Sequence, residues 1–175
     1  MTEKQQNIIN SGLELFATKG FDSTSTNAIA KNAGVSEGLI FRHFNNKEGL
    51  LEAIIQMGME KANQYFSLVM LEEDPRERIK MALSLPAQVE KEEYNFWRLT
   101  YSLKWQRGTY EDAAFEAFTK SMVDAFEQLG YSDPKSEAKL IEVFIDGIAT
   151  ELLLKDSPDP TPLLNSLLAK YELIN

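Results

Sequence analysis

The chain's 175 residues suffice for one domain, or for a small module joined to a larger one, and a composition of 43% hydrophobic and 26% charged residues is that of an ordinary globular protein. It has no cysteine, one histidine (His43), no apolar leader and no apolar run of the roughly 18 residues that a membrane span needs. These features argue against disulfides, against metal centres built on cysteine or paired histidine, and against secretion and membrane insertion. We therefore expect a cytoplasmic protein without a metal or cofactor.

The charge is unevenly distributed along the chain. Residues 1–50 hold five basic and five acidic side chains, whereas residues 51–175 hold 13 basic and 22 acidic ones and so carry the whole net charge of −9. A polyanion would be repelled by the later part of the chain. If the protein binds one, we expect the first part to do so.

The sequence begins with two predicted helices. Thr2 and Gln5 fit a capping box, and the apolar helical face that follows ends at Gly20. Hydroxyl side chains at residues 23–26 can cap a second, shorter helix, which Gly34 ends.

Further helices follow, each marked by residues that cap or break helices. Ser36 can cap a helix over about residues 37–44, and an asparagine pair can cap a long one over about residues 47–72. An Asp-Pro pair begins the next helix, which we expect Pro86 to end. The remaining helices are expected at about residues 87–105, 110–129, 134–155 and 161–173. With no strand pattern in the sequence, the simplest fold is all-α with about nine helices.

Residues 26–44 have the spacing of a helix-turn-helix. Ala30 is small enough for two helices to meet at a steep angle, and Gly34, four residues later, can adopt the positive φ of the turn. Apolar residues bracket the turn at Ile29, Ala33, Val35 and Ile40. In a DNA-binding motif of this kind the second helix enters the major groove, but an ordinary helical hairpin has the same spacing, so the pattern alone leaves both interpretations open.

Four stretches in and around this motif extend the pattern: GFDSTST at residues 20–26, IAKNAGVS at 29–36, FRHF at 41–44 and NKEGL at 46–50. Together they resemble the tetracycline-repressor (TetR) family of bacterial regulators over about residues 5–55. The resemblance implies an N-terminal three-helix DNA-binding domain over residues 1–46 and a C-terminal helical bundle over residues 47–175 that binds a ligand and dimerises. The later sequence carries no family motif of its own.

The resemblance also implies which residues meet DNA. Thr26 is expected at a phosphate, Asn27 at a base edge, and His43 and Lys47 at the DNA backbone. The remaining expected contacts lie on the recognition helix: Ser36, Glu37, Gly38, Leu39 and Arg42. Lys47 has a physical reason for its role, because its ammonium and the backbone N–H groups of a helix start can face one phosphate. For His43, a structural role beside Phe44 is the alternative.

Three neighbouring positions depart from the family pattern. The family commonly has lysine, threonine and tyrosine where this chain has Glu37, Leu39 and Phe41. Glu37 could instead accept a hydrogen bond from a cytosine amino group, and Leu39 could pack on a thymine methyl group. Phe41 has no donor for a phosphate, and we expect it to pack in the domain core. These changes predict weaker and more salt-sensitive DNA binding than the family norm.

An aromatic face on the helix expected at residues 87–105 suggests a ligand pocket. Its rings follow helical spacing at Tyr94, Trp97, Tyr101 and Trp105. The simpler interpretation is that they are plain core; the alternative is the wall of a pocket for a hydrophobic or aromatic effector, with Arg98 available to an anionic one. Apolar residues of neighbouring helices could complete it: Met57, Met59, Phe66, Phe115 and Phe118.

The last two predicted helices carry wide apolar faces. Their residues are Ile141, Phe144, Ile145, Ile148 and Leu152 on the first, and Leu163, Leu164, Leu167 and Leu168 on the second. These faces could simply cover the core of the monomer. The TetR resemblance implies instead a dimer interface of two helices from each subunit, and such a dimer would read an inverted repeat in double-stranded DNA.

Taken together, these patterns predict a dimeric, sequence-specific transcriptional regulator. We expect a repressor that a hydrophobic or aromatic small molecule releases from a palindromic operator. An enzyme is not expected, because the sequence has no motif with attached chemistry. The alternative is a helical protein-binding adaptor, derived from such a regulator and with weakened DNA binding.

Overall fold

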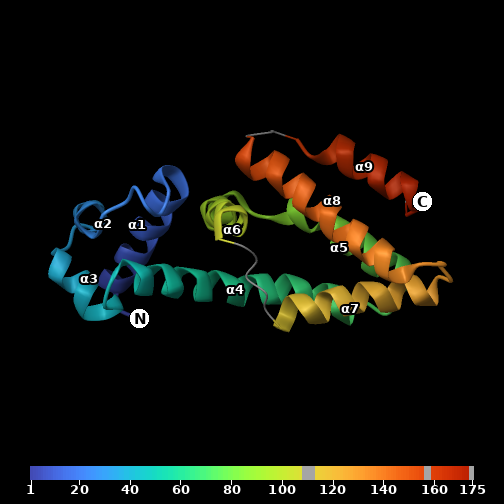
Figure 1. Cartoon of the computed structure of the whole chain (residues 1–175), viewed down its shortest axis with the longest axis horizontal. Helices are drawn as coiled ribbons and strands as arrows, with labels where there is room; N and C mark the ends of the chain where they lie inside the picture. Colours follow the sequence, from blue (N-terminus) through green and yellow to red (C-terminus); the bar gives the residue numbers. More distant parts are fainter. Residues whose placement is uncertain (108–112, 156–158, 174–175) are drawn as a thin grey trace. The chain divides into compact units, whose positions relative to one another are not determined.

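The computed structural model describes residues 1–107, 113–155 and 159–173, apart from the side chains of 104–107 and 113–114. Every element within these residues is helical (Figure 1). The helices are α1 (Glu3–Lys19), α2 (Thr26–Ala33), α3 (Glu37–Phe44), α4 (Lys47–Leu71), α5 (Pro75–Gln88), a 3₁₀ turn (Lys91–Glu93), α6 (Tyr94–Arg107), α7 (Ala113–Gln128), α8 (Pro134–Leu154) and α9 (Thr161–Lys170). The predicted all-α fold is confirmed. None of the described helices is long and apolar enough to cross a membrane.

Helix ends are held by the local hydrogen bonds that the sequence predicts. The Thr2 side chain accepts from the Gln5 backbone at 3.3 Å and the Gln5 side chain accepts from the Thr2 backbone at 2.8 Å, which completes the capping box of α1. At the start of α4, Asn46 Oδ1 accepts from the Gly49 backbone at 2.7 Å. Asp74 and Asp133 cap α5 and α8 in the same way, each followed by a proline at the first helical position.

Two predicted boundaries are wrong. Pro86 does not end α5 but lies buried inside its last turn, and the helix continues to Gln88. A proline disfavours the helical conformation of the residue before it and removes its own N–H, yet residues after it can remain helical. The chain then leaves the helix at Val89, so α6 begins at Tyr94, later than expected.

The chain divides into two compact units, which we call unit 1 and unit 2. Unit 1 comprises residues 1–61 and 91–109, and unit 2 comprises residues 62–90 and 110–175. Helix α4 is continuous through the point of division. Unit 1 thus contains more than the three N-terminal helices, since α6 and the first part of α4 pack with them. The functional division after residue 46 stays a prediction.

The core of unit 1 joins α1, α2 and α3 to α4 and α6. Its most deeply buried side chains are Ile8, Phe16, Ile29, Ile40, Leu50, Ile54, Leu99 and Leu103. Glycine allows close approach at one helix pair: a Cβ atom on Gly58 of α4 would lie 1.8 Å from the ring of Phe96 on α6. The ring therefore occupies the space that any larger residue at position 58 would need.

Unit 2 has its own core between α5, α7, α8, α9 and the end of α4. Its most deeply buried side chains are Val69, Ile79, Leu83, Phe118, Met122, Phe126, Ile141 and Ile148. One charged group lies within this packing: Glu142, 7% exposed, accepts from Thr119 Oγ1 at 2.6 Å and pairs with Lys139 Nζ at 2.5 Å. The pairing satisfies a carboxylate that burial would otherwise destabilise.

Candidate nucleic-acid interface

The turn between α2 and α3 has the geometry that a helix-turn-helix requires. Gly34 ends α2 with φ 67° and ψ 33°, in the left-handed region that glycine reaches without strain. The backbone N–H of Val35 donates to the Ala30 carbonyl at 3.0 Å, and that of Gly34 donates to the Lys31 carbonyl at 3.3 Å. These two bonds form a Schellman motif. With Ile29 and Ile40 fully buried, they fix α3 against α2 and leave its other face to solvent.

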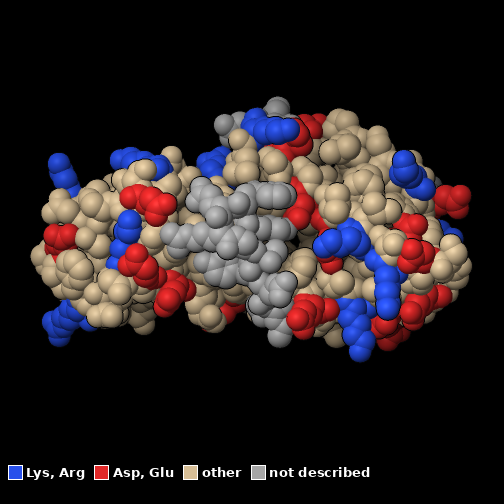
Figure 2. Space-filling view, viewed as in Figure 1, with Lys and Arg blue, Asp and Glu red and all other residues tan. Residues whose placement is uncertain are grey.

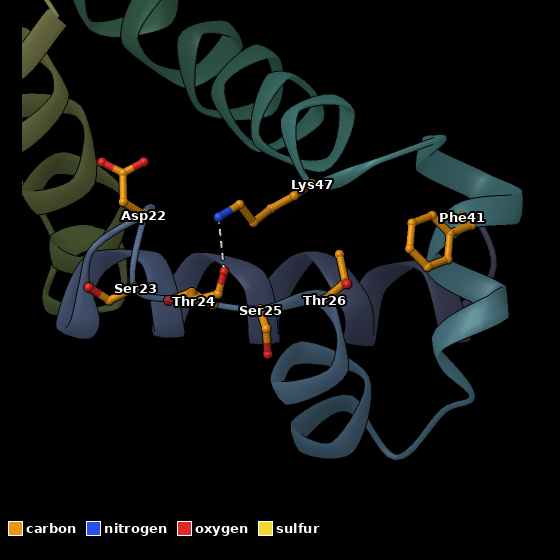
Figure 3. A pocket seen from close by; sticks show the side chains of 7 residues that line it. All are labelled: Asp22, Ser23, Thr24, Ser25, Thr26, Phe41 and Lys47. Carbon is orange, nitrogen blue, oxygen red and sulfur yellow. Dashed lines mark hydrogen bonds between the residues drawn. The ribbon is translucent and has the colours of Figure 1, made fainter.

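Beside these helices lies an open hollow of about 420 Å³ (Figure 3). It is lined by the connection from α1 to α2, the first residue of α2, one residue of α3 and the first residue of α4: Asp22, Ser23, Thr24, Ser25, Thr26, Phe41 and Lys47. Four consecutive residues with hydroxyl side chains, the buried Thr24 among them, thus line it together with one carboxylate and one ammonium group. Groups of this kind can donate hydrogen bonds to phosphate oxygens.

Lys47 shapes the hollow through the connection between α1 and α2. Its ammonium donates to the Thr24 carbonyl at 3.0 Å (Figure 3). It also donates to the Phe21 carbonyl at 2.9 Å and lies 4.3 Å from the centre of the Phe21 ring. The expected phosphate contact is therefore also a structural residue, because it ties the start of α4 to the loop that leads into α2.

The hydroxyl groups of the hollow also make hydrogen bonds within the protein. Thr24 Oγ1 donates to the Gly20 carbonyl at 2.8 Å, and Ser25 Oγ accepts from the Ala28 backbone at 3.1 Å as the cap of α2. Thr26 Oγ1 donates to Glu37 Oε1 at 2.6 Å, which joins the first residue of α2 to the first residue of α3. Sequence reasoning assigned both Thr26 and Glu37 to DNA and missed this contact between them.

The other expected DNA contacts differ in exposure. Asn27, Ser36, Gly38 and Arg42 are exposed, whereas Leu39 is partly buried against the core of unit 1. His43 is partly buried as well, with Nδ1 3.2 Å from the side-chain nitrogen of Gln5 and its ring edge-on to Phe44.

The expectation that Phe41 packs in the core is wrong. Its side chain is 48% exposed and lines the hollow, on the side facing Thr26 (Figure 3). A helix of eight residues can bury only one face, and Ile40 takes that position in α3. The sequence signal was available, because Phe41 is four residues from Glu37 and so shares its face.

Charged side chains of both signs lie interspersed over the face of the molecule shown in Figure 2, in unit 1 as in unit 2. On this face a nucleic acid would meet single cations rather than a continuous basic surface. Binding would then depend on where the individual cations lie more than on the net charge of the protein.

The residues predicted to line a ligand pocket fall into two groups. Tyr94, Trp97, Arg98 and Tyr101 belong to α6 in unit 1 and are partly buried, whereas the buried face of α6 is formed by Phe96, Leu99 and Leu103. In unit 2, Phe66 packs on Phe118 and Phe115 at ring distances of 4.9 and 6.4 Å. The side chain of Trp105 lies outside the described residues. Whether these groups form a pocket stays a prediction.

A buried polar atom belongs to a residue of α4 shortly before Phe66. Asn63 precedes Phe66 by one helical turn of α4, and its amide oxygen is buried without a hydrogen-bond partner among the described residues. Buried polar atoms in proteins are nearly always paired, so this oxygen is a candidate for a hydrogen bond from a bound molecule.

Most residues predicted at a dimer interface lie in the core of unit 2. Ile141, Ile148, Leu152, Leu167 and Leu168 are buried, and Phe144, Ile145 and Leu164 pack partly buried against the same core. Of the predicted set, Leu163 is the most exposed, at 47%.

Another face of α8 is apolar and exposed. Leu140, Val143 and Leu154 are 43%, 53% and 39% exposed, and their spacing places them on one side of the helix with the exposed Gly147. Together with Leu163 of α9, we call these residues the α8 stripe. Periodicity could not identify it, because apolar residues occupy most of the circumference of α8.

Comparison with known proteins adds a family and a fold. Residues 8–54 match the family model described as bacterial regulatory proteins, tetR family. The uncharacterized HTH-type transcriptional regulator YerO of Bacillus subtilis is 43% identical over 65 residues, which cover 35% of this chain and 22% of that relative. The chain thus matches about a fifth of the length of this curated relative.

Solved structures resemble the chain over nearly its whole length. A transcriptional regulator from Saccharomonospora viridis in complex with choline has a TM-score of 0.75 at 18% identity, with 97% of each chain covered. AibR in complex with isovaleryl coenzyme A and operator DNA has a TM-score of 0.65 at 20% identity, with 84% of this chain and 86% of that chain covered. At these identities the likeness shows a shared fold.

Proposed function

Because the chain belongs to the tetR family of bacterial regulatory proteins, whose members are transcriptional regulators and not enzymes, we propose that it acts as a dimeric repressor. It binds an inverted-repeat operator in double-stranded DNA and is released by a small, largely apolar effector. The observation that carries this proposal is the exposed face of α3 beside a hollow lined by hydroxyl groups and Lys47.

DNA recognition is proposed for the exposed side of α2 and α3. Gly38 has open space around its α-carbon within the described residues, so backbone can approach a groove closely there. Arg42, one turn later, is exposed and can reach a phosphate or a guanine edge. The hollow then receives a neighbouring phosphate, which the backbone N–H groups at the start of α2 also attract.

A second copy of this chain is the proposed occupant of the α8 stripe. One eight-residue recognition helix reads too few bases for a specific site, whereas two related by a two-fold axis read half-sites about 34–36 Å apart or a multiple of this. Four exposed apolar side chains on neighbouring helices of unit 2 suit such a self-complementary contact. The dimer therefore uses the exposed side of α8 and α9, not the face first predicted from sequence.

Effector binding is proposed for unit 2. The rings of Phe66, Phe115 and Phe118 offer an apolar wall, and the buried amide oxygen of Asn63 can accept a hydrogen bond from a ligand donor. The structural neighbours crystallised with choline and with isovaleryl coenzyme A support a small-molecule role for this fold. Because α4 is one helix from Lys47 to Leu71, a ligand that displaces its later part also displaces Lys47 beside the hollow. The ligand must bind the DNA-incompetent state more tightly, since equal affinity for both states shifts nothing.

A protein-binding adaptor is the second candidate, and two observations favour it. Glu37 brings a carboxylate to the edge of the hollow, and the exposed Phe41 offers an apolar surface where a phosphate donor would serve DNA better. The adaptor requires that the protein form no sequence-specific complex with DNA.

Selection of bound duplexes from a random DNA library tests the proposal. At about 0.1 M salt, where the Debye length is ~10 Å, we expect enrichment of an inverted repeat. Arg42→Ala should lower affinity for the selected duplex, whereas Arg76→Ala, which removes an exposed arginine of α5, should not. A folded protein that enriches no sequence would contradict the repressor and favour the adaptor.

A further inference from the structure

We propose that Glu37 competes with DNA phosphate for the hydroxyl of Thr26, and so weakens binding to duplexes that offer its carboxylate no new partner. The inference rests on the proposed DNA-binding function. It assigns Glu37 a role in rejecting DNA that lacks the correct sequence, and no role in attracting DNA of any sequence.

The hydrogen bond itself sets up the competition. Thr26 Oγ1 lies 2.6 Å from Glu37 Oε1, a short distance typical of hydroxyl bonds to a charged acceptor. A hydroxyl group has a single proton to donate. While Thr26 donates to Glu37, its oxygen can offer a phosphate no hydrogen bond, and the carboxylate beside it repels the phosphate.

The position of Glu37 in α3 favours this arrangement. It is the first residue of the helix, where the N-terminal end of the helix dipole stabilises a negative charge. Ser36, the residue before it, makes no side-chain capping bond within the described residues. Glu37 is the acidic residue of the first turn of α3.

The Thr26 contact differs from the other hydrogen bonds around the hollow. Thr24 and Lys47 donate to backbone carbonyls, and Ser25 accepts from a backbone N–H, so breaking these bonds would disturb the loop or a helix cap. Breaking the Thr26–Glu37 bond requires only rotation of the Glu37 side chain. It is therefore the bond in the hollow that DNA can exchange without deforming the backbone.

The exchange makes binding depend on what the released carboxylate meets. On a duplex of unsuited sequence it faces phosphates or acceptor atoms, and both repel it. At a site where a cytosine amino group faces α3, the carboxylate accepts a hydrogen bond, and the loss of the Thr26 contact is offset. Specificity then arises largely from rejection of other sequences, which is one of the two routes to discrimination.

Four variants test the proposal: Glu37→Gln, Glu37→Ala, Thr26→Val, and Thr26→Val combined with Glu37→Ala. Fluorescence anisotropy measures their affinity for a labelled pool of random-sequence duplexes at about 0.1 M salt. We expect Glu37→Ala to bind the pool about 3- to 10-fold more tightly than the wild type, the ratio that corresponds to one net hydrogen bond. In the Thr26→Val background, Glu37→Ala should raise the affinity for the pool clearly less, because no hydroxyl remains to be released.

Glu14→Gln is the matched control. It removes the same charge from unit 1 and alters another bond between helices, Asn32 Nδ2 to Glu14 Oε2 at 3.1 Å, away from the hollow. Thermal unfolding of each variant shows whether it remains folded. If Glu37→Ala is unfolded, Glu37→Gln, which keeps the shape and an acceptor but loses the charge, carries the test and should also bind the pool more tightly than Glu14→Gln does.

Each outcome separates this inference from the proposed function. If the wild type binds duplexes and the Glu37 variants bind no more tightly than Glu14→Gln, the competition is refuted while DNA binding stands. If Glu37→Ala raises the affinity for the pool equally in the wild type and in Thr26→Val, charge repulsion alone acts and the exchange is refuted. If neither the wild type nor any variant binds a duplex, the proposed function and the inference both fail. If only the Glu37 variants bind, the competition is supported, whereas the proposed function, which requires the wild type to bind a duplex, fails.

Discussion

The two units use their polar side chains in different ways. In unit 1, Lys47, Thr24 and Ser25 hold a loop and a helix cap around an open hollow, so the groups that stabilise the fold also face the proposed ligand. In unit 2, the buried Glu142 bonds to Thr119 and to the exposed Lys139, while the exposed side of α8 is largely apolar. On α8, the groups that stabilise the fold and those proposed for self-association are thus separate.

Helix length is one physical reason for this difference. Helices α2 and α3 have eight residues each, too few to be stable in water without caps and tertiary contacts. Helix α8 has 21 residues, of which the inward face alone supplies a core. The difference teaches that a substitution in the hollow should change stability and binding together, whereas one on the α8 stripe should change assembly alone.

The largest effect is expected where unit 1 is most tightly packed. Gly58→Ala places a methyl group where the Phe96 ring lies, and the required displacement should cost about 2–3 kcal/mol of unfolding free energy. Gly38→Ala is the control in the same unit, since it meets open space in a helix and should leave stability equal or slightly raised. Urea unfolding compares them, and equal stability of the two variants would contradict the described packing.

The next largest effect is expected at Lys47. Lys47→Met removes the donor of two hydrogen bonds to loop carbonyls and should cost about 2 kcal/mol, with DNA affinity falling as well. Lys139→Met, which removes a partner of the buried Glu142 in unit 2, should lower stability and leave DNA affinity unchanged once the protein is folded. Loss of DNA affinity in both variants would break the comparison between the units.

Local residue patterns sufficed to predict many of the helix ends of unit 1, since a capping or turn residue acts on the few residues beside it. Thr2, Gly34 and Asn46 all serve the helix ends that the sequence assigned to them. The same patterns did not reveal the Thr26–Glu37 bond, because it joins residues eleven apart whose meeting depends on how α3 packs. Nor did they reveal that the Lys47 ammonium binds carbonyls of a loop more than twenty residues earlier.

In unit 2 the positions of the helices followed from the sequence, but their buried faces did not. The apolar residues of α8 cover more than one side, so periodicity could not separate Ile141, in the core, from Leu140, at the surface. Only the packing of α5, α7 and α9 against one side makes that distinction. The same reason applies to α6, where Phe96 and not Trp97 is on the buried face.

A smaller effect, confined to assembly, is expected on the α8 stripe. Leu140→Lys and Val143→Lys should each weaken self-association by about 1–2 kcal/mol, because apolar surface can no longer be buried, while the monomer keeps its helical circular dichroism. Leu68→Lys changes an exposed leucine of α4 outside the stripe and serves as control. Sedimentation equilibrium measures the association, and unchanged association in the stripe variants would place the dimer contact elsewhere.

The smallest effect is a pH dependence in unit 2. Burial, together with a hydrogen bond to the Glu137 carboxylate, raises the pKa of Tyr171 above its ordinary value of 10.0. The folded state therefore holds this proton more tightly than the unfolded state, so the contribution to stability is complete below about pH 10 and is lost as the pH rises further. Tyr171→Phe should flatten this alkaline decline, whereas Tyr94→Phe, at a tyrosine of unit 1, should not. Identical pH profiles of unfolding in both variants would exclude this linkage.

The central claim is that the hollow and the exposed face of α3 receive DNA. An NMR titration of the isotope-labelled protein with the duplex recovered by selection tests it most directly. We predict that signals of Thr24, Thr26, Gly38, Arg42 and Lys47 shift in step with DNA concentration, while those of the buried Ile141 in unit 2 stay in place. Binding of the duplex with shifts confined to unit 2, and none around the hollow, would contradict the account.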